Sequence, residues 1–531
     1  MYKRIFLGLI LLQNVLCFSN ILRLNNPLQI NKYYNKQKRI NICGIKNSYI
    51  KMIDEKNNIN NNKKFNNFDW KKNWYPIALE DRTDKNKPFE FTLLGNSLVI
   101  WWDKINNEWC ATDNKCSHRL APLSEGRITD KGVVECPYHG WCFNSTGNCV
   151  KMPQREKPYC ENNNRFNINS YNTVTKQGII WIWPEKYING YKPSTNLIPT
   201  SPPIDNGVMT DDFSLDLPYD YSILLENIID ISHVPFTHHG SQGNRNLAKP
   251  IKYNIRNDIS NKGFKIDIIK GFGNHTEFKA PCYQHTNLQI KTINLFNIFK
   301  SHKKNRDNSI KTLINAWVVA YAIPKSPGYS RIIARFPMQT PNNLFTKFLL
   351  FSKPSFIRHM GRNEVLEEDT IFLHEQEKEL LLRDNNYYNY NSTLKHYNLG
   401  TTADTSVLLW RKWLKKAGPI PWGENKIIKN FNKKEELINR EEYHLKHCKI
   451  CQNAYKNLES IKNKIVYLKA IIFILVWPLL SYYNPTKIYI NRLISFSLLI
   501  SSSIIWFICN QLQIKMKVGK YPPKRNIIIN Y

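Results

Sequence analysis

Short apolar runs separated by turn residues fill the chain between Trp74 and Trp183. Gly, Asn and Asp stand between the runs, which cover residues 91–94, 97–102, 132–136 and 178–183. Short runs in this arrangement are typical of a small antiparallel β domain. We therefore predict such a domain over residues 70–190.

A Pro-rich stretch at residues 193–203 ends this pattern and marks a domain boundary. Beyond it, strand-like runs at residues 312–323 and 331–336 mix with helix-like runs at residues 219–231 and 363–382. This mixture predicts an α+β domain, which we place at residues 205–440. Polar insertions at residues 300–309 and 385–391 are expected to be surface loops.

Two apolar stretches near the carboxyl end, residues 470–486 and 493–514, contain no charged residue. They are long enough for membrane helices, and Lys469 and Arg492 at their edges could reach the interface. We predict a transmembrane helical hairpin over residues 465–514. Because both stretches are near the lower limit of length, buried or interfacial helices are the alternative.

A basic tail, residues 515–531, follows the second apolar stretch. Its positive charges are Lys515, Lys517, Lys520, Lys524 and Arg525. By the positive-inside rule, these charges place the tail on the same side of the membrane as the α+β domain.

The amino end has the composition of targeting segments. Lys3 and Arg4 precede a mostly apolar run that is too short to span a membrane, so residues 1–19 are predicted to be a signal peptide. Residues 20–69 form a transit-like basic segment and an Asn-rich and Lys-rich linker, with no acidic residue before Asp54. Together they indicate a plastid reached through the secretory route. Plain secretion with a basic tail is the alternative.

The bulk composition limits the function further. With 531 residues the chain exceeds the size of one hydrophobic core, so two folded units are expected. The net charge of +33 accompanies Asn and Ile in runs such as residues 57–67 and no recognition motif, so we predict no nucleic-acid partner. Twelve cysteines are too few for a disulfide scaffold in a chain of this length.

Two short motifs each offer one thiolate and one imidazole. Cys116 and His118 are followed, after seventeen residues, by Cys136 and His139. A Rieske [2Fe-2S] cluster needs two Cys on one iron and two His on the other, whereas a zinc finger usually pairs Cys with Cys at short spacing. We predict that these four residues bind a Rieske cluster and that Trp141 shields it from water.

A second pattern places Asn227, Asp230, His233 and His238 within twelve residues. Two imidazoles and one carboxylate form the facial triad of Fe(II) oxygenases, which leaves positions open for O2. A regular helix would splay two histidines that are five residues apart, so we expect Pro235 to break the turn and let them converge.

These motifs resemble the Rieske oxygenases, and within them the plastid group that contains pheophorbide a oxygenase and translocon-associated Rieske proteins. The resemblance runs from about Trp74 to Leu512. It is carried by NWYPI at 73–77, CSHRLAPLSEGR at 116–127, CPYHGW at 136–141, HVPFTHHG at 233–240 and TAD at 402–404. The resemblance implies a Rieske cluster, a mononuclear Fe(II), O2 as co-substrate and reduced ferredoxin as electron donor.

The resemblance also assigns roles to acidic residues. It implies a carboxylate iron ligand in a later helix, for which we choose Asp369 and keep Glu367 and Glu368 as alternatives. Asp230 matches a carboxylate that links a cluster histidine of one subunit to an iron histidine of its neighbour, which implies a homotrimer. Its spacing from His233 would place both on one helix face. Asn227 and Asp230 are therefore candidate catalytic residues.

Cys448 and Cys451, in a segment we assign to residues 441–464, resemble a Cys-x2-Cys element that this group carries before its anchor. A redox-regulated thiol pair is one interpretation, and structural zinc with His444 or His447 is the other. The remaining histidines, His359 among them, are interpreted as ordinary residues.

By resemblance, the substrate is a chlorophyll-derived tetrapyrrole, with ring-opening oxygenation of pheophorbide a as the first choice. The alternatives are hydroxylation of another tetrapyrrole and a redox-sensing role in a plastid protein import complex. The expected location is a plastid membrane, envelope or thylakoid, with the catalytic domain in the stroma.

Overall fold

The computed structural model of the chain describes residues 68–156, 164–188, 190–271, 273–293, 311–339, 352–383, 393–422, 431–476, 478 and 488–526. The predicted signal peptide, nearly all of the transit-like segment and the predicted loops at 300–309 and 385–391 lie outside these residues.

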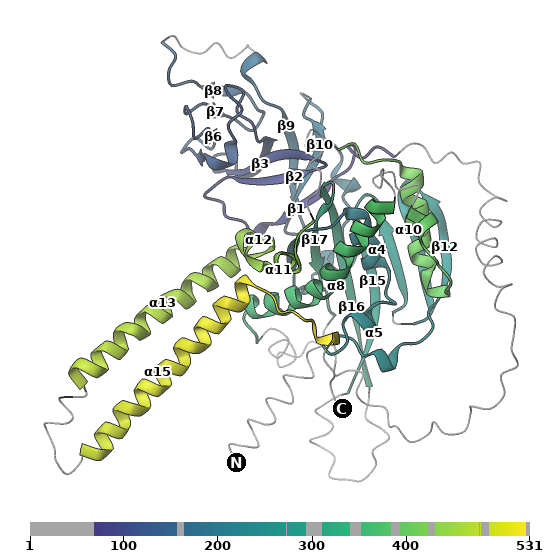
Figure 1. The fold of residues 1–531 in the computed structure, drawn as a ribbon. Helices are drawn as coiled ribbons and strands as arrows, with labels where there is room; N and C mark the ends of the chain where they lie inside the picture. Colours follow the sequence, from purple (N-terminus) through teal and green to yellow (C-terminus); the bar gives the residue numbers. More distant parts are fainter. Residues whose placement is uncertain are drawn as a thin grey trace, which may run out of the picture.

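The first folded part is built from two antiparallel sheets (Figure 1). The larger sheet has the order β1-β10-β9-β4-β3-β2, formed by β1 (Tyr75–Leu79), β2 (Phe89–Leu93), β3 (Asn96–Asp103), β4 (Glu108–Asp113), β9 (Ser170–Lys176) and β10 (Ile179–Lys186). The smaller sheet contains β5 (Arg127–Ile128), β6 (Val134–Glu135), β7 (Cys142–Phe143) and β8 (Cys149–Lys151). The predicted antiparallel β domain is therefore confirmed.

The second part is a seven-stranded antiparallel sheet covered by helices, which confirms the predicted α+β class. Its order is β11-β17-β16-β15-β14-β13-β12, with β11 (Phe213–Leu217), β12 (Lys252–Ser260), β13 (Gly263–Lys270), β14 (His275–Lys279), β15 (Tyr283–Ile293), β16 (Lys311–Ser326) and β17 (Tyr329–Arg335). Three helices pack on it: α4 (Tyr221–Ile229) on β16, α8 (Ser355–Arg383) on β11 and α10 (Thr405–Ala417) on β12 (Figure 1).

Short helices connect these elements. They are α3 (Pro202–Asp205), α5 (Val234–Thr237), α9 (Thr393–His396), α11 (Lys434–Leu437) and α12 (Arg440–Tyr443). The 3-10 turns are η2 (Glu80–Arg82), η3 (Leu123–Glu125), η4 (Asn164–Phe166), η5 (Thr195–Leu197), η6 (Arg245–Leu247), η7 (Thr402–Asp404), η8 (Leu445–His447) and η11 (Lys524–Asn526).

Arg331, which forms a buried ion pair within the seven-stranded sheet, also contacts the first folded part. Arg331 on β17 donates to both carboxylate oxygens of Asp216 on β11, at 2.5 and 2.8 Å, and to the carbonyl of Ile77 on β1 at 3.0 Å. The backbone N–H of Leu94, in the β2–β3 turn, donates to the carbonyl of Pro324 on β16. The β domain and the catalytic sheet therefore share polar contacts as well as one apolar core.

Two long helices, α13 (Lys449–Ile471) and α15 (Ile488–Lys517), lie side by side and project away from the body (Figure 1). The π-helical turn η9 (Ile472–Val476) continues α13. Residues Arg492–Lys517 are long and apolar enough to cross a membrane, which agrees with the second predicted span. Most of the first predicted span lies outside the described residues and remains a prediction.

The distribution of side chains along this hairpin distinguishes its two ends. Near the body, Lys462 on α13 donates to Asn510 and Gln513 on α15, at 3.1 and 2.8 Å. Farther out, large apolar side chains such as Phe473 and Phe496 are exposed. An exposed apolar surface of this kind suits contact with lipid.

The segment after α15 returns to the catalytic part. Lys524 pairs with Glu364 on α8 at 2.9 Å, and Arg525 donates to the carbonyl of Glu368 at 2.5 Å. Arg440 donates to the carbonyl of Lys515 at 2.7 Å. The basic tail therefore contacts the α+β domain, and its position relative to a membrane stays a prediction.

Candidate metal centres

The two Cys/His loops have matching backbone geometry. In each, the cysteine N–H donates to the carbonyl five residues later, from Cys116 to Ala121 at 2.9 Å and from Cys136 to Trp141 at 2.8 Å. The fourth residue after each cysteine is left-handed, with φ of +61° in the first loop and +70° at Gly140 in the second. Glycine adopts this conformation without strain, and the resulting tight loops present their side chains to one another.

The four predicted cluster ligands gather between these loops. Cys116 and Cys136 are buried in one apolar cluster, and the rings of His118 and His139 lie 4.6 Å apart. His118 Nδ1 is buried and has no hydrogen-bond partner among the described residues. A buried ring nitrogen without a partner fits a metal ligand. Trp141 stacks on the His118 ring at 4.6 Å, which covers one face of the site.

A second group of candidate ligands lies in the α+β domain. His233 Nε2 is 3.8 Å from Asp369 Oδ1, and His238 Nε2 is 3.4 Å from Asp369 Oδ2. One ligand atom from each of the three residues lies within 4.8 Å of the others. Two imidazoles and one carboxylate at these distances fit a single Fe(II) with open positions.

Each histidine of this group is oriented by its second nitrogen. His233 Nδ1 contacts the carbonyl of Asp230, and His238 Nδ1 donates to Glu368 at 2.9 Å. Burial lowers the pKa of His238, but the charge of Asp369 and the hydrogen bond with Glu368 outweigh burial and raise it. The pocket therefore favours a positive charge where a metal ion would sit.

The three consecutive acidic residues on α8 have different partners. Glu367 accepts two hydrogen bonds from Arg440, at 2.5 and 2.7 Å, and Glu368 accepts from His238 and from Ser241. Asp369 faces the Nε2 atoms of both histidines. The arrangement favours Asp369 as the ligand over its two neighbours.

Two details of the sequence reasoning are wrong. Pro235 does not break a helix: it lies in the first turn of the short helix α5, where its missing N–H costs nothing, and His233 and His238 flank this helix as its caps. Asp230 and His233 also do not share a helix face, because α4 ends at Ile229 and Asp230 is its C-cap. The two histidines still converge, with ring centroids 5.3 Å apart.

Comparison with known proteins supports both centres. Residues 73–172 match the Rieske [2Fe-2S] domain, and residues 278–386 match the pheophorbide a oxygenase domain. Pheophorbide a oxygenase from Arabidopsis thaliana is 30% identical over 438 residues, which covers 78% of each chain. The chain belongs to the pheophorbide a oxygenase family of Rieske oxygenases.

This Rieske oxygenase is also similar to proteins that are named for other substrates. Flavonoid 8-hydroxylase 2 from Ocimum basilicum is 30% identical over 426 residues, covering 75% of this chain and 76% of the hydroxylase. Among solved structures, dicamba monooxygenase bound to 3,6-dichlorosalicylic acid is 16% identical with a TM-score of 0.49, covering 65% of this chain and 97% of that one.

A Rieske oxygenase is an oxidoreductase, and the chain carries a Rieske [2Fe-2S] cluster and a mononuclear iron. The two groups of residues described above fit these cofactors in ligand type. Asn227 on α4 donates to Asp369 Oδ1 at 3.4 Å, so it contacts the carboxylate side of the iron site. The Asp230 carboxylate accepts from the N–H of Ser232 at 2.7 Å.

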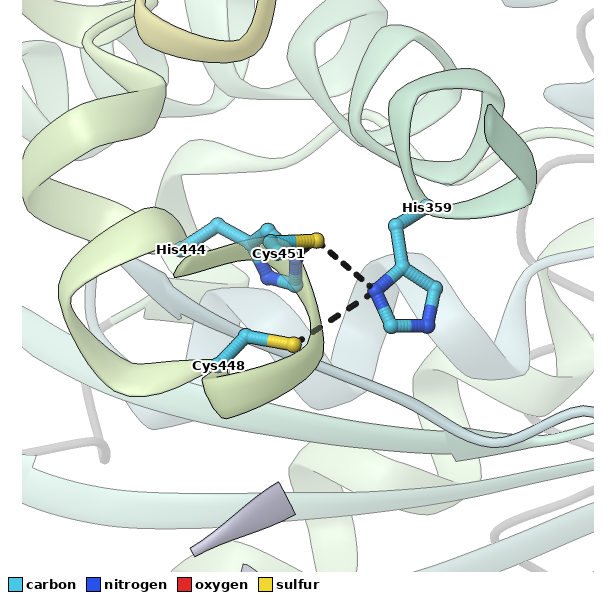
Figure 2. Close-up of side chains that lie close together, drawn as sticks. All are labelled: His359, His444, Cys448 and Cys451. Carbon is cyan, nitrogen blue, oxygen red and sulfur yellow. Dashed lines mark hydrogen bonds between the residues drawn. The ribbon is translucent and has the colours of Figure 1, made fainter. Parts of the chain in front are cut away.

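The structure also gathers four residues at the base of the hairpin. Cys448 and Cys451 are buried free cysteines that lie beside His444 and His359 (Figure 2). His447 lies outside this group, with Nε2 3.5 Å from the Asp216 carboxylate. The interpretation of His359 as an ordinary residue missed its place in this group.

Sequence reasoning also missed the orienting role of Glu368, which it considered only as a ligand. The sequence around Glu368 does not reveal this role. Which side chain a residue next to Asp369 contacts depends on how α8 is turned relative to the rest of the fold. The contact of Arg525 with the carbonyl of Glu368 was also not predictable, because the two residues are 157 positions apart in the chain.

Proposed function

We propose that this Rieske oxygenase uses O2 and electrons from reduced ferredoxin to oxygenate a chlorophyll-derived tetrapyrrole. Ring opening of pheophorbide a is the first choice. The observation that carries the proposal is the complete group of His233, His238 and Asp369 in a chain 30% identical to pheophorbide a oxygenase over 78% of both lengths.

In this proposal, Cys116, His118, Cys136 and His139 hold the cluster, and His233, His238 and Asp369 hold the iron. When bound, these groups supply single electrons and a site where O2 is activated. Glu368 keeps the Nδ1 hydrogen on His238, so that Nε2 presents its lone pair to the iron. Asn227 restrains the Asp369 carboxylate through its side-chain amide.

The surface around the cluster suits an electron donor or a neighbouring subunit. Leu120 and Tyr138, one in each loop, are 72% and 62% exposed, although both are large apolar residues. Arg119 beside them is exposed as well. Such an apolar patch with a positive charge fits an acidic carrier such as ferredoxin.

We further propose a homotrimer in which Asp230 passes electrons between neighbouring subunits. In support, Asp230 is only partly buried, and its backbone carbonyl contacts His233, a proposed iron ligand. Co-expression of His139→Ala and His233→Ala chains tests this arrangement, because each chain lacks a different centre. Mixed assemblies should recover part of the wild-type turnover. Assemblies as inactive as either variant alone would rule out transfer between subunits.

We propose that the protein is anchored in a plastid membrane, with its catalytic domain in the stroma. The apolar helix α15 supports an anchor, and the Arabidopsis thaliana relative is named as chloroplastic. Protease treatment of intact plastids that carry the protein tests the orientation. A stromal catalytic domain stays protected until the envelope is opened, whereas cleavage in intact plastids contradicts it.

The substrate is tested by turnover of the full chain in detergent or lipid discs. The reaction contains reduced ferredoxin and isotopically labelled O2. Each assay adds one candidate substrate: pheophorbide a, another chlorophyll derivative or a flavonoid. Products are identified by mass spectrometry. We expect label in a ring-opened product of pheophorbide a with wild-type protein and none with His233→Ala. Label only in flavonoids contradicts the proposal.

A second candidate function is hydroxylation of another substrate. The flavonoid 8-hydroxylase, at the same 30% identity, favours it because overall similarity does not distinguish a tetrapyrrole from a smaller ring system. Label in a hydroxylated product of another tetrapyrrole would select that alternative. A role only in redox sensing at an import complex predicts no labelled product from any member of the panel.

A further inference from the structure

Two histidines and two cysteines meet where the catalytic domain joins the anchor (Figure 2). His359 lies in the first turns of α8, and Cys451 lies in the first turn of α13. Cys448 is the N-cap of α13, and His444 lies between α12 and η8. Because α8 also carries Asp369, the group connects the helix of the iron site to the helix that leads to the membrane.

All four side chains are withdrawn from solvent. The exposed fractions are 1% for His359, 3% for His444, 2% for Cys448 and 2% for Cys451. Buried polar groups need partners, and one ligand atom from each of these four residues lies within 4.8 Å of the others, next to an apolar cluster. Such a site suits a ligand that all four can bind at once.

The distances are those of ligands around one small ion. His359 Nδ1 lies 3.2 Å from Cys451 Sγ and 3.6 Å from Cys448 Sγ, and His444 Nε2 lies 3.3 Å from Cys451 Sγ. A tetrahedral zinc with Zn–S of about 2.3 Å and Zn–N of about 2.0 Å places ligand nitrogen and sulfur about 3.5 Å apart. A [2Fe-2S] cluster would instead separate the cysteine pair from the histidine pair on two irons.

His444 is oriented as a metal ligand. Its Nδ1 donates to the carbonyl of Ser214 on β11 at 2.8 Å, which leaves the Nε2 lone pair directed at Cys451. A backbone carbonyl bound to the second nitrogen is the usual support of a zinc histidine. The ring of Phe213 stacks on His444 at 4.8 Å and closes one side of the site.

We propose that His359, His444, Cys448 and Cys451 bind one structural zinc ion that fastens α13 to α8. The proposal goes beyond the oxygenase function and does not depend on the substrate. It favours the zinc interpretation of the Cys-x2-Cys element over the redox switch, and it adds His359, 92 residues before Cys451 in the chain. Closed four-ligand sites of this type stabilise folds and leave no position for a substrate.

One contact must change when zinc binds. His359 Nε2 lies 2.5 Å from Arg82 Nη1, and a guanidinium group can only donate. In the neutral ring the hydrogen is then on Nδ1, facing the two sulfur atoms. Zinc on Nδ1 moves this hydrogen to Nε2, so Arg82 must withdraw. Arg82→Gln supplies an oxygen that can accept from Nε2, and this variant should keep its zinc; a variant without zinc contradicts the assigned orientation of His359.

The test begins with the metal content of the full chain, purified without a metal-affinity tag from medium that contains zinc and iron. We expect about one zinc per chain in wild type, and loss of that zinc in His359→Ala and in Cys448→Ser/Cys451→Ser. His447→Ala is the matched control, because His447 neighbours Cys448 in sequence but lies near the Asp216 carboxylate and is not one of the four grouped residues. All variants should keep the Rieske electron paramagnetic resonance signal.

A second measurement on wild type covers the case in which the variants fail to fold. X-ray absorption at the zinc edge should give two sulfur ligands at about 2.3 Å and two nitrogen ligands at about 2.0 Å. Wild-type protein without zinc, with a Cys448 to Cys451 disulfide that thioredoxin reduces, would overturn the proposal in favour of the thiol switch. Iron bound in place of zinc would overturn the choice of metal.

Discussion

The carboxylate of Glu368 lies 2.9 Å from Nδ1 of His238 and determines which nitrogen of that ring can bind iron. The adjacent carboxylate, Asp369, lies on the Nε2 side of the same ring. Two consecutive residues of α8 thus act on opposite sides of one histidine. In the proposed site, Glu368 holds the Nδ1 hydrogen of His238, while Asp369 is the carboxylate ligand of the iron.

Glu368→Ala should weaken iron binding by about 10- to 100-fold, because His238 loses the acceptor that holds its Nδ1 hydrogen. Iron titration into the iron-depleted protein measures the affinity. Glu367→Gln is the control, since Glu367 binds Arg440 and not an iron ligand. Equal iron affinity in Glu368→Ala and wild type would remove Glu368 from the support of the site.

The Rieske cluster depends on ligands from both loops. His118→Cys or His139→Ala should abolish the Rieske electron paramagnetic resonance signal. One iron of the cluster needs two cysteines and the other needs two histidines, and either variant removes one of the histidines. Cys142→Ser is a suitable control, as this buried free cysteine lies on β7 next to the second loop. Signals of unchanged shape in both histidine variants would refute the ligand assignment.

Asp230→Asn should retain both metals but lose most turnover, because in the proposed electron path the carboxylate links the centres without binding either metal. The backbone carbonyl that contacts His233 is unchanged in this variant. Rapid mixing with substrate and O2 measures oxidation of the reduced cluster. A normal oxidation rate would exclude Asp230 from the electron path.

The buried ion pair of Asp216 and Arg331, within the seven-stranded sheet, should contribute strongly to stability. Breaking the buried Asp216 to Arg331 pair with Asp216→Asn should lower the free energy of unfolding by about 3–5 kcal/mol. The exposed pair of Arg256 and Asp267 is the control, and Asp267→Asn should cost less than about 1 kcal/mol. Denaturant unfolding measures both. Equal effects would mean that the buried pair stabilises the fold no more than an exposed pair does.

The same pair predicts a pH dependence. Burial raises the pKa of Asp216, but the charges of Arg331 and Lys325 outweigh it and hold the pKa well below its ordinary value. The stability that the pair contributes is therefore fully present above the unfolded pKa of about 3.9, and it is lost as the pH falls toward the lower folded value. Unfolding of wild type should depend more steeply on acid pH than unfolding of Asp216→Asn.

Most of the candidate ligands could be proposed from the sequence because they lie in short motifs. Cys116, His118, Cys136 and His139 lie within two short loops, and His233 and His238 flank one helical turn. From the sequence, Asp369 is the chosen ligand, with Glu367 and Glu368 as alternatives; only the structure shows how the three differ, because consecutive helical residues point in directions about 100° apart. Their partners, and not their spacing, distinguish the proposed iron ligand Asp369 from its neighbours.

Other features depend on long-range contacts that a sequence pattern does not contain. His359 joins Cys451 across 92 residues, and its only local context is an ordinary helix. Strand β12, with the sequence KYNIRNDIS, is largely polar because much of it is exposed, so it lacks the apolar run that identified β16. The predicted reason for the convergence of His233 and His238 is likewise wrong, since Pro235 lies in the first turn of α5 and does not break a helix.

The iron content of Asp369→Ala tests the central claim most directly. Wild-type protein should hold about three irons per chain, two in the cluster and one in the mononuclear site. Asp369→Ala should hold about two, with an unchanged Rieske signal and no turnover, because only the second site loses a ligand. A variant that keeps the third iron and its turnover would contradict the site formed by His233, His238 and Asp369.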